Sequence, residues 1–406
     1  IDEQTLTYLA LTGRSKEQID LVASHAKAAG LFRHEGAETP TYDRVIDFDL
    51  GTVRRSISGP SKPHNLKAPS SLRDAFLEKV GPSAESEAPA NEDIAPDGAV
   101  AIAAIASCTN TANPAAIFAA ALLARNAIAR GLKPPAWVKT SFAPGSRAVP
   151  AYLARAGLMA PLEELGFHVI GFGCTTCGGK SGPLKPAAQL AIENGRRCAA
   201  VLSGNRNFDG RIHRLVAASF LSSPSLVIAY ALAGSVMRDL DTEPLGVGAD
   251  GQAVFLRDIW PSPMEVESYA KTYITPDLFA ETAGLDGHAQ RQWDEVAAPS
   301  GDLFEWDLRS SYIVEPPFFE DTGPFFARSN AIEGARVLGM YDDGLTTDHL
   351  SPGGEIPPDS PAGLYLQEIG IKPVDFNSYV GRRGNHHVLS RGAYANVRIK
   401  NLMTPD

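Results

Sequence analysis

Cysteine is scarce in this sequence, with four cysteines among 406 residues. So few cysteines exclude a disulfide framework, and in a cytosolic protein clustered cysteines are more often metal ligands or catalytic groups. Long apolar runs are also missing, because runs such as 225–236 fall well short of a membrane span. The start of the chain shows no basic segment followed by an apolar one, which argues against a secretory signal. We therefore expect a cytoplasmic protein with no membrane partner.

Positive charge is in short supply as well, since the formal net charge at pH 7 is −10. An acidic chain is a poor non-specific binder of nucleic acid and of anionic membranes. A small anionic substrate is not excluded, because a local cluster of arginines can outweigh the overall sign. The composition, with 44% hydrophobic and 21% charged residues, is that of a globular protein. The 406 residues are too many for one ordinary core and predict two or three domains.

Strand and helix patterns alternate between residues 99 and 235. Residues 99–110 form a continuous apolar run, typical of a buried parallel strand. Residues 114–131 are predicted to form a helix, with Pro114 in its first turn and Gly131 at its end. Further strands are predicted at 136–145, 167–173 and 197–205, and further helices at 148–166, 183–195 and 211–224. Residues 225–234 form another apolar element, which the sequence does not assign to helix or strand. The alternation predicts an α/β fold with a mainly parallel sheet, in which ligands bind at the carboxyl ends of the strands.

The rest of the chain is organised around this region. A helix is predicted at 15–30, where Ser15 and Gln18 form a capping box, and a strand at 45–53. We expect five parts: the end of a preceding α/β domain at 1–80, a linker at 81–98, the main α/β domain at 99–258, an extended linker at 259–333 and the start of a last domain at 334–406. Because the chain starts at Ile1 and ends without a closing element, we expect it to be a piece of a longer protein.

The unusual residues of the α/β region follow three of its predicted strands. In chain order they are Cys108 after the first strand, Cys174 and Cys177 in the segment GCTTCGG, and Asn205, Arg206 and Arg211 in the segment SGNRNFDGR. In a parallel sheet these turns lie at one edge, so we expect the thiols and the guanidinium groups to share a crevice. Two arginines at such a place favour bidentate recognition of a carboxylate.

Three of the cysteines have surroundings that favour a metal site over simple burial. Cys108, Cys174 and Cys177 lie in turns of small and polar residues, whereas Cys198, inside an apolar strand, is interpreted as a buried small side chain. Structural zinc would need a fourth ligand that is not obvious nearby, and a thioredoxin-like pair needs no third thiol. Three thiolates suit a [4Fe–4S] cluster with one open iron that acts as a Lewis acid. A zinc-stabilised structural module stays open as an alternative.

Seven motifs, in order and at plausible spacing, resemble the aconitase family. They span nearly the whole chain and are ASCTNTANP, VKTSFAPGSRAV, GCTTCGGKSGPL, LSGNRNFDGRIH, DIWPS, TTDHLSP and RGAYANVRIKN. The resemblance implies an aconitase-type α/β domain, a linker and the beginning of a swivelling β/α domain. It also implies a hydro-lyase that converts citrate to isocitrate through cis-aconitate, with a [4Fe–4S] cluster as cofactor.

The same resemblance implies roles for individual residues. The cluster ligands would be Cys108, Cys174 and Cys177. The substrate, a small tricarboxylate, would be bound by Asn205, which lies close to the cluster in the family, and by Arg206, Arg211 and Arg391. Asp348, within TTDH, matches a catalytic position. We also expect the full-length protein to be a monomer.

Departures from the family pattern leave alternatives open. The family's N-terminal Asp-His and Asp-Ser-His motifs and its glycine/serine loop, whose serine is the catalytic base, have no counterpart in residues 1–406. We therefore expect this chain to be inactive by itself. The segment GPSKPH at 59–64 is more similar to the 2-methylcitrate dehydratase branch, and Lys180 departs from the usual aconitase residue. Some family members bind RNA without their cluster, an alternative that the net charge of −10 disfavours.

Overall fold

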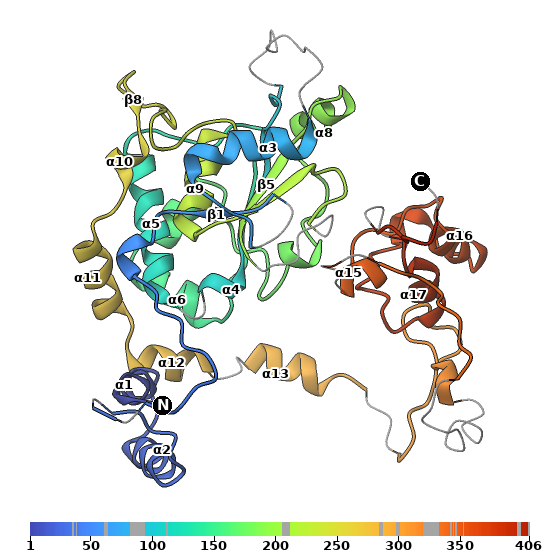
Figure 1. Ribbon diagram of the computed structural model, residues 1–406, viewed down its shortest axis with the longest axis horizontal. Coiled ribbons are helices and arrows are strands. Elements are labelled where there is room, and N and C mark those ends of the chain that lie inside the picture. The colour runs from blue at the N-terminus through green and yellow to red at the C-terminus, as the bar shows by residue number, and fades with distance from the viewer. Residues whose placement is uncertain are drawn as a thin grey trace. The chain divides into compact units, whose positions relative to one another are not determined.

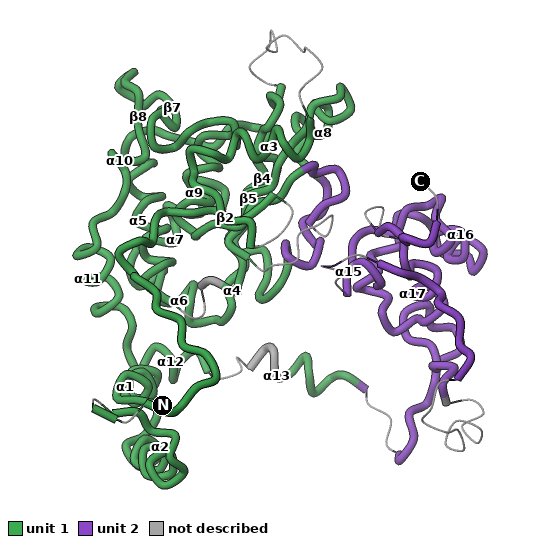
Figure 2. Tube along the Cα trace, in the orientation of Figure 1, with its two compact units in different colours: residues 1–175, 184–206, 218–296 green, residues 176–183, 207–217, 297–406 purple. Residues whose placement is uncertain are grey.

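The computed structural model describes residues 1–34, 36–37, 39–60, 64–81, 94–110, 113–204, 212–283, 287–297, 301–319, 333–341, 343, 345, 347–351, 353–395 and 399–404. Its contacts divide the chain into two compact units (Figure 2). Unit 1 comprises residues 1–175, 184–206 and 218–296, and unit 2 comprises residues 176–183, 207–217 and 297–406. Both units combine segments that are far apart in the sequence, whereas the five predicted parts are continuous, so those five boundaries stay predictions.

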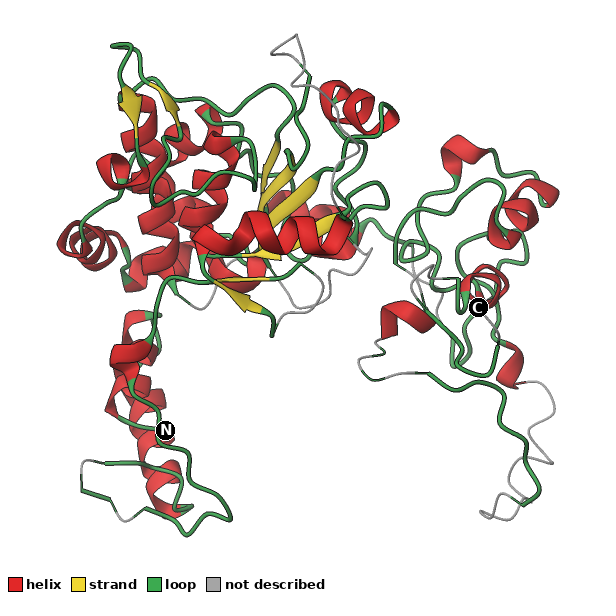
Figure 3. Cartoon of the chain, turned by 45° about the horizontal axis from the view of Figure 1, so that its top comes forward, coloured by secondary structure: helices red, strands yellow, loops and turns green. Residues whose placement is uncertain are grey.

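Within the described residues, the core of unit 1 is a six-stranded sheet with the order β2-β1-β6-β5-β3-β4 (Figures 1 and 3). The strands are β1 (Ile57–Ser58), β2 (Leu66–Lys67), β3 (Val100–Ile105), β4 (Lys139–Phe142), β5 (Ala199–Ser203) and β6 (Ala218–Leu221). Strands β6, β5, β3 and β4 are parallel, and β1 is antiparallel to both β2 and β6. The sheet confirms the predicted α/β class with a mainly parallel sheet.

Strand β3 lies within the parallel part of the sheet, and all its residues are buried. Such a strand needs apolar cover on both faces, which explains why its sequence is continuously apolar rather than alternating. Helix α9 (Pro224–Ala233) contacts β3 and β5 and is itself buried on every side. Helix α5 (Pro114–Ala129) packs against α9, and α3 (Leu72–Val80) contacts β6. The α5 helix begins and ends close to where the sequence predicts.

Unit 1 contains further helices and a second, small sheet. Its other helices are α1 (Glu3–Leu11), α2 (Lys16–Ala28), α4 (Ser107–Asn110), α6 (Ala148–Arg155), α7 (Met159–Glu164), α8 (Pro186–Glu193), α10 (Leu256–Ile259), α11 (Pro263–Tyr273), α12 (Pro276–Ala283) and α13 (Gly287–Asp294), with a small sheet of β7 (Gly246–Val247) and β8 (Ala253–Val254). The capping box of Ser15 and Gln18 is present at the start of α2. None of the helices in the described ranges is long and apolar enough to cross a membrane.

Two predicted elements of the sheet differ from the structure. The helix predicted at 211–224 is wrong, because Ala218–Leu221 form β6 between β5 and β1. A short apolar run is compatible with either type, and here pairing with two neighbouring strands decides. The strand predicted at 167–173 is reduced to one parallel bridge between Val169 and Phe142. Gly173 then turns the chain with a φ of +94°, a conformation that suits glycine.

Two further segments also differ from their predictions. The stretch at 45–53 contains no strand, only a short 3₁₀ turn at Leu50–Thr52. Its side chains Ile46, Phe48 and Leu50 are 74%, 68% and 78% exposed. The linker predicted to be extended from residue 259 instead contains helices α11 and α12. The side chain of Ser262 caps α11 by accepting a hydrogen bond from the backbone N–H of Glu265 at 3.2 Å.

Unit 2 has a small core of its own. Its described elements are the 3₁₀ turns η3 (Thr176–Gly178), η4 (Pro317–Phe319) and η5 (Pro373–Asp375) and the helices α15 (Thr347–Leu350), α16 (Pro361–Glu368) and α17 (His386–Gly392). Helices α16 and α17 pack together, and the buried side chains include Leu366, Phe376 and Val388. The buried guanidinium of Arg382 donates hydrogen bonds to the carbonyl oxygens of Phe376, Ser311 and Asp375 at 2.7, 2.8 and 3.0 Å.

Candidate metal centre

The carboxyl ends of three parallel strands lie at one edge of the sheet in unit 1. In its register, Ile105 at the end of β3 pairs with Phe142 on β4 and with Ser203 on β5. The backbone N–H of Ala106 donates a hydrogen bond to Ser203 Oγ at 3.1 Å. This bond joins the first residue after β3 to the last residue of β5. The structure therefore contains the sheet edge, at the carboxyl ends of parallel strands, at which the sequence predicts the candidate site.

Cys108 and Cys174 reach this edge by different routes. Cys108 lies in α4, which follows β3 after one residue, and it is exposed. Cys174, also exposed, lies in a loop that is held against the end of β4. There the N–H of Ile170 donates to the carbonyl of Phe142, and that of Gly173 to the carbonyl of Pro144, both at 3.0 Å. One β-bridge and these backbone hydrogen bonds therefore hold the Cys174 loop at the sheet edge, where the sequence predicts a full strand.

The side chains of the two exposed cysteines lie close together. Ser107 Oγ is 3.9 Å from Cys174 Sγ. Partial burial, and after it the negative charge of Cys174, raise the pKa of Cys108. Two thiolates side by side repel each other, and a bound cation would reverse that effect and favour both ionised forms. A bound cation beside Cys108 would therefore oppose this rise in its pKa.

Cys177 lies further along the same motif, in η3, and belongs to unit 2. It is buried, with 3% of its surface exposed. The hydroxyl groups of Thr175 and Thr176 are buried as well, and neither has a hydrogen-bond partner in the described part of the chain. A buried hydroxyl without a partner is costly, so two of them beside two cysteines suit a loop that receives a ligand.

The described residues fit an iron–sulfur group in chemistry but only partly in geometry. Such a group is held by cysteine thiolates, and hydroxyl groups such as those of Thr175 and Thr176 can donate hydrogen bonds to its sulfur atoms. Over the described ranges, however, no three side chains of histidine, cysteine, aspartate or glutamate are placed to hold a metal ion. Within the described residues, the candidate metal centre therefore consists of the neighbouring thiols of Cys108 and Cys174.

The other predicted site residues lie outside the described residues or in unit 2. Asn205, Arg206 and Arg211 lie outside the described residues. Asp348 lies in α15, and its side chain is outside what the structure describes. Arg391 lies in α17, where its guanidinium donates to the carbonyl of His387 at 3.0 Å and lies 4.5 Å from the ring centre of Tyr365. The roles of these residues stay predictions.

The fourth cysteine confirms its interpretation as a structural residue. Cys198 is fully buried, and its burial, with a smaller contribution from Asp97, raises its pKa to about 12. A thiol with so high a pKa is neither a nucleophile nor a ready metal ligand at neutral pH. Two serines of the site were not predicted from the sequence, Ser107 beside Cys174 and Ser203 beside Ala106. The sequence feature that could have indicated them is a serine at or just after the end of a continuously apolar strand.

Comparison with known proteins identifies the family. Residues 1–234 match the model of the aconitase family (aconitate hydratase), which is more than half of the 406-residue chain. The chain belongs to the aconitase family, and the resemblance of its motifs is confirmed.

Its relatives include the aconitate hydratase A of several bacteria. The chain is 45% identical to that of Bacillus subtilis over 423 residues and 46% identical to that of Thermus thermophilus over 421 residues. It is 45% identical to that of Salmonella typhimurium over 416 residues. These alignments cover 99–100% of this chain and 46% of each relative, so the chain spans about half the length of the curated relatives it matches.

Proposed function

We propose that this chain carries the cluster-binding part of a hydro-lyase that dehydrates citrate and rehydrates cis-aconitate to isocitrate. Membership of the aconitase family supports the reaction class. The observation that carries the proposal is the pair of exposed thiols, Cys108 and Cys174, at the carboxyl edge of a parallel sheet. That edge is where ligands bind in open α/β sheets. A cytoplasmic location and a monomeric state stay predictions.

In this proposal Cys108, Cys174 and Cys177 hold a [4Fe–4S] cluster. A cluster with three thiolate ligands leaves one iron open, which supplies a Lewis acid for an unactivated hydroxyl leaving group. The chain itself positions the cysteine ligands and supplies hydrogen-bond donors beside them. The turn after β3 fixes Cys108, and the backbone bonds to Phe142 and Pro144 fix the loop of Cys174. The buried hydroxyls of Thr175 and Thr176 are donors next to these ligands.

Substrate binding is assigned to residues at the same predicted edge and in unit 2. Arg206, Arg211 and Arg391 would pair with substrate carboxylates, Asn205 would lie beside the cluster and Asp348 would take part in proton transfer. A substrate with three carboxylates needs several cations close to it. Local arginines must provide them, since the chain as a whole carries a net charge of −10. The alternative substrate is 2-methylcitrate, which the segment GPSKPH at 59–64 favours.

Anaerobic reconstitution with iron and sulfide tests the cluster. We expect a broad visible absorption band and about four irons per chain, as a site of thiolates holds in this cluster type. Cys108→Ser, Cys174→Ser and Cys177→Ser should each lose iron and sulfide. Cys198→Ser is the matched control and should keep both, because Cys198 is fully buried and is not among the predicted ligands. Unchanged iron content in the first three variants would falsify the ligand assignment, and zinc without sulfide would indicate a structural zinc module.

A second experiment tests the substrate without requiring turnover. Citrate, isocitrate and 2-methylcitrate are added to the reconstituted protein, and the electron paramagnetic resonance spectrum of the reduced cluster is recorded. The preferred acid should change the spectrum at the lowest concentration. Arg211→Lys should raise the concentration needed, because lysine cannot form the bidentate pair. A spectrum that none of the three acids alters would contradict the assignment of a tricarboxylate substrate.

A further inference from the structure

A serine hydroxyl contacts both exposed thiols of the candidate metal centre. Ser107 is the first residue of α4, directly before Cys108, and it is 7% exposed. Its Oγ is 3.9 Å from Cys174 Sγ. Burial raises the pKa of Cys108 most and Cys174 raises it further, whereas a hydrogen bond with the Ser107 hydroxyl lowers it. One buried oxygen is therefore shared by sulfur atoms from two separate segments of the chain.

The backbone before Ser107 is held by the sheet. The N–H of Ala106 donates a hydrogen bond to Ser203 Oγ at 3.1 Å, and the carbonyl of Ile105 accepts one from the N–H of Ala143 at 2.8 Å. These bonds join the end of β3 to β5 on one side and to the residue after β4 on the other. Because Ser107 follows Ala106 directly, its hydroxyl extends from a firmly held part of the backbone.

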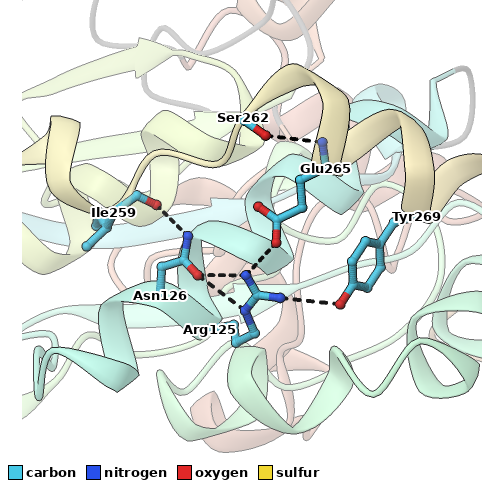
Figure 4. A network of polar contacts seen from close by, with 6 residues as sticks. All are labelled: Arg125, Asn126, Ile259, Ser262, Glu265 and Tyr269. Carbon is cyan, nitrogen blue, oxygen red and sulfur yellow. Dashed lines mark hydrogen bonds and ion pairs between the residues drawn. The ribbon is translucent and has the colours of Figure 1, made fainter.

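The helix that follows α4 is fixed as well. Helix α4 contacts α5, and polar side chains join α5 to α10 and α11 (Figure 4). Arg125 on α5 pairs with Glu265 on α11 at 2.7 Å and donates to the hydroxyl of Tyr269 at 3.3 Å. Asn126 donates to the carbonyl of Ile259 in α10 at 3.0 Å. The short helix α4 therefore packs on a helix that is anchored through two consecutive side chains.

The chemistry of a metal-bound cysteine decides which of the two side chains donates. A cysteine binds iron as a thiolate, which has no proton to give. The Ser107 hydroxyl has one proton and two lone pairs, so it would be the donor to Cys174 Sγ. Hydrogen bonds to the sulfur atoms are among the features that set the reduction potential of an iron–sulfur cluster.

We propose that Ser107 is a positioning residue of the candidate metal centre, whose hydroxyl holds the sulfur of Cys174 in place and raises the reduction potential of the bound cluster. A reduced cluster carries one more negative charge than an oxidised one, so a hydrogen bond to its sulfur ligand favours the reduced form. This role deepens the proposed function and rests on it, because it requires an iron–sulfur cluster. The contact between Ser107 and Cys174 does not depend on iron.

The contact is tested on the metal-free chain in mildly acidic buffer, where thiols are protonated. The infrared S–H stretching band of Cys174 is identified by its absence from Cys174→Ser. This band should shift in Ser107→Ala, which removes the hydroxyl, and move back in Ser107→Thr, which keeps one. A band that stays in place in Ser107→Ala would show that the two side chains do not interact, and the proposal would be overturned.

The effect on the cluster is tested on the reconstituted chain. Ser107→Ala should lower the midpoint potential in a redox titration followed by electron paramagnetic resonance. It should also lose half of its iron at about one tenth of the chelator concentration, because a group that hydrogen-bonds to a metal ligand typically contributes about ten-fold or more to metal affinity. Ser107→Thr should restore both values. Ser219→Ala should change neither, because Ser219 is 6% exposed and lies on β6, which carries no predicted ligand.

The outcomes distinguish this inference from the proposed function. A reconstituted Ser107→Ala with unchanged midpoint potential and unchanged iron retention would overturn the role of Ser107 and leave the cluster assignment standing. The same result with a lower unfolding temperature of the metal-free variant would identify Ser107 as a structural residue only. An unaltered chain that takes up no iron would contradict the proposed function and, with it, the effect of Ser107 on the potential.

Discussion

Ser203 Oγ accepts a hydrogen bond of 3.1 Å from the backbone N–H of Ala106, and both residues are buried. The two residues are 97 positions apart in the sequence, and their contact connects the end of β5 to the residue that follows β3. Cys108 lies two residues beyond Ala106. The hydroxyl of a serine on one strand therefore helps to fix the turn that presents a cysteine after another strand.

Replacing this serine should both destabilise the chain and loosen the turn. Ser203→Ala should lower the free energy of unfolding by about 1 kcal/mol, the net value of one buried hydrogen bond. It should also accelerate alkylation of Cys108, which chemical denaturation and iodoacetamide labelling can measure in one preparation. Ser219→Ala, at a buried position on β6, is the control and should leave Cys108 alkylation unchanged. Equal labelling rates in all three proteins would show that the contact does not position the turn.

The four cysteines should divide into two pairs on alkylation of the native, metal-free protein. Cys108 and Cys174 are exposed and should react before Cys177 and Cys198, which are buried and should be protected. Cys198 should be the slower of the buried pair, because its raised pKa of about 12 leaves almost no thiolate at pH 8. Mass spectrometry of the labelled peptides gives the order. Early labelling of Cys198 would contradict its placement in the core.

The buried guanidinium of Arg382 should be among the main stabilising groups of unit 2. Arg382→Lys keeps the charge but cannot reach three carbonyl oxygens at once, and it should cost about 1–3 kcal/mol. The stacking on Tyr312, with the guanidinium 4.1 Å from the ring centre, is weakened as well. Hydrogen exchange in α17 reports the loss. Arg383→Lys, at the exposed neighbouring position, should leave exchange in α17 unaltered, and an effect as large as that at Arg382 would contradict the burial argument.

Unit 2 should lose some stability in mild acid through His387. Burial, then His386, then Arg391, lower the pKa of His387 below its ordinary value. The unfolded chain therefore binds a proton at a higher pH than the folded chain, so the contribution of His387 is complete above about pH 6.5 and declines as the pH falls. Thermal unfolding between pH 8 and 5 should show a shallower decline for His387→Gln. A parallel course for both proteins would remove His387 as the cause, and His25→Gln in unit 1 serves as the control.

Elements fixed by local signals could be predicted from the sequence. Pro114 and Gly131 bracket α5, Ser15 and Gln18 start α2, and the unbroken apolar run of β3 indicates burial on both faces. Elements fixed by tertiary pairing could not. Residues 218–221 become a strand because β5 and β1 lie on either side. The segment around Val169 has a neighbour in β4 alone in the described structure, and it keeps a single bridge.

The candidate site shows the same division. The alternation of strand and helix patterns predicts a parallel sheet, so the placement of Cys108 and Cys174 at its carboxyl edge could be predicted. The contacts that hold them there could not, because Ser203 and Pro144 are distant in sequence and have no motif of their own. The assignments to Asn205, Arg206, Arg211, Asp348 and Arg391 depend on the family resemblance and stay predictions.

The exposed stretch at residues 45–50 has a consequence for handling the protein. Its extended backbone presents Ile46, Phe48 and Leu50 to solvent, a pattern that another copy of the same stretch can pair with. Asp47 and Asp49 alternate with them and keep copies apart by charge repulsion, which dissolved salt screens. Colloidal stability should therefore fall as ionic strength rises, so dilute buffers suit storage and Phe48→Lys suits crystallisation.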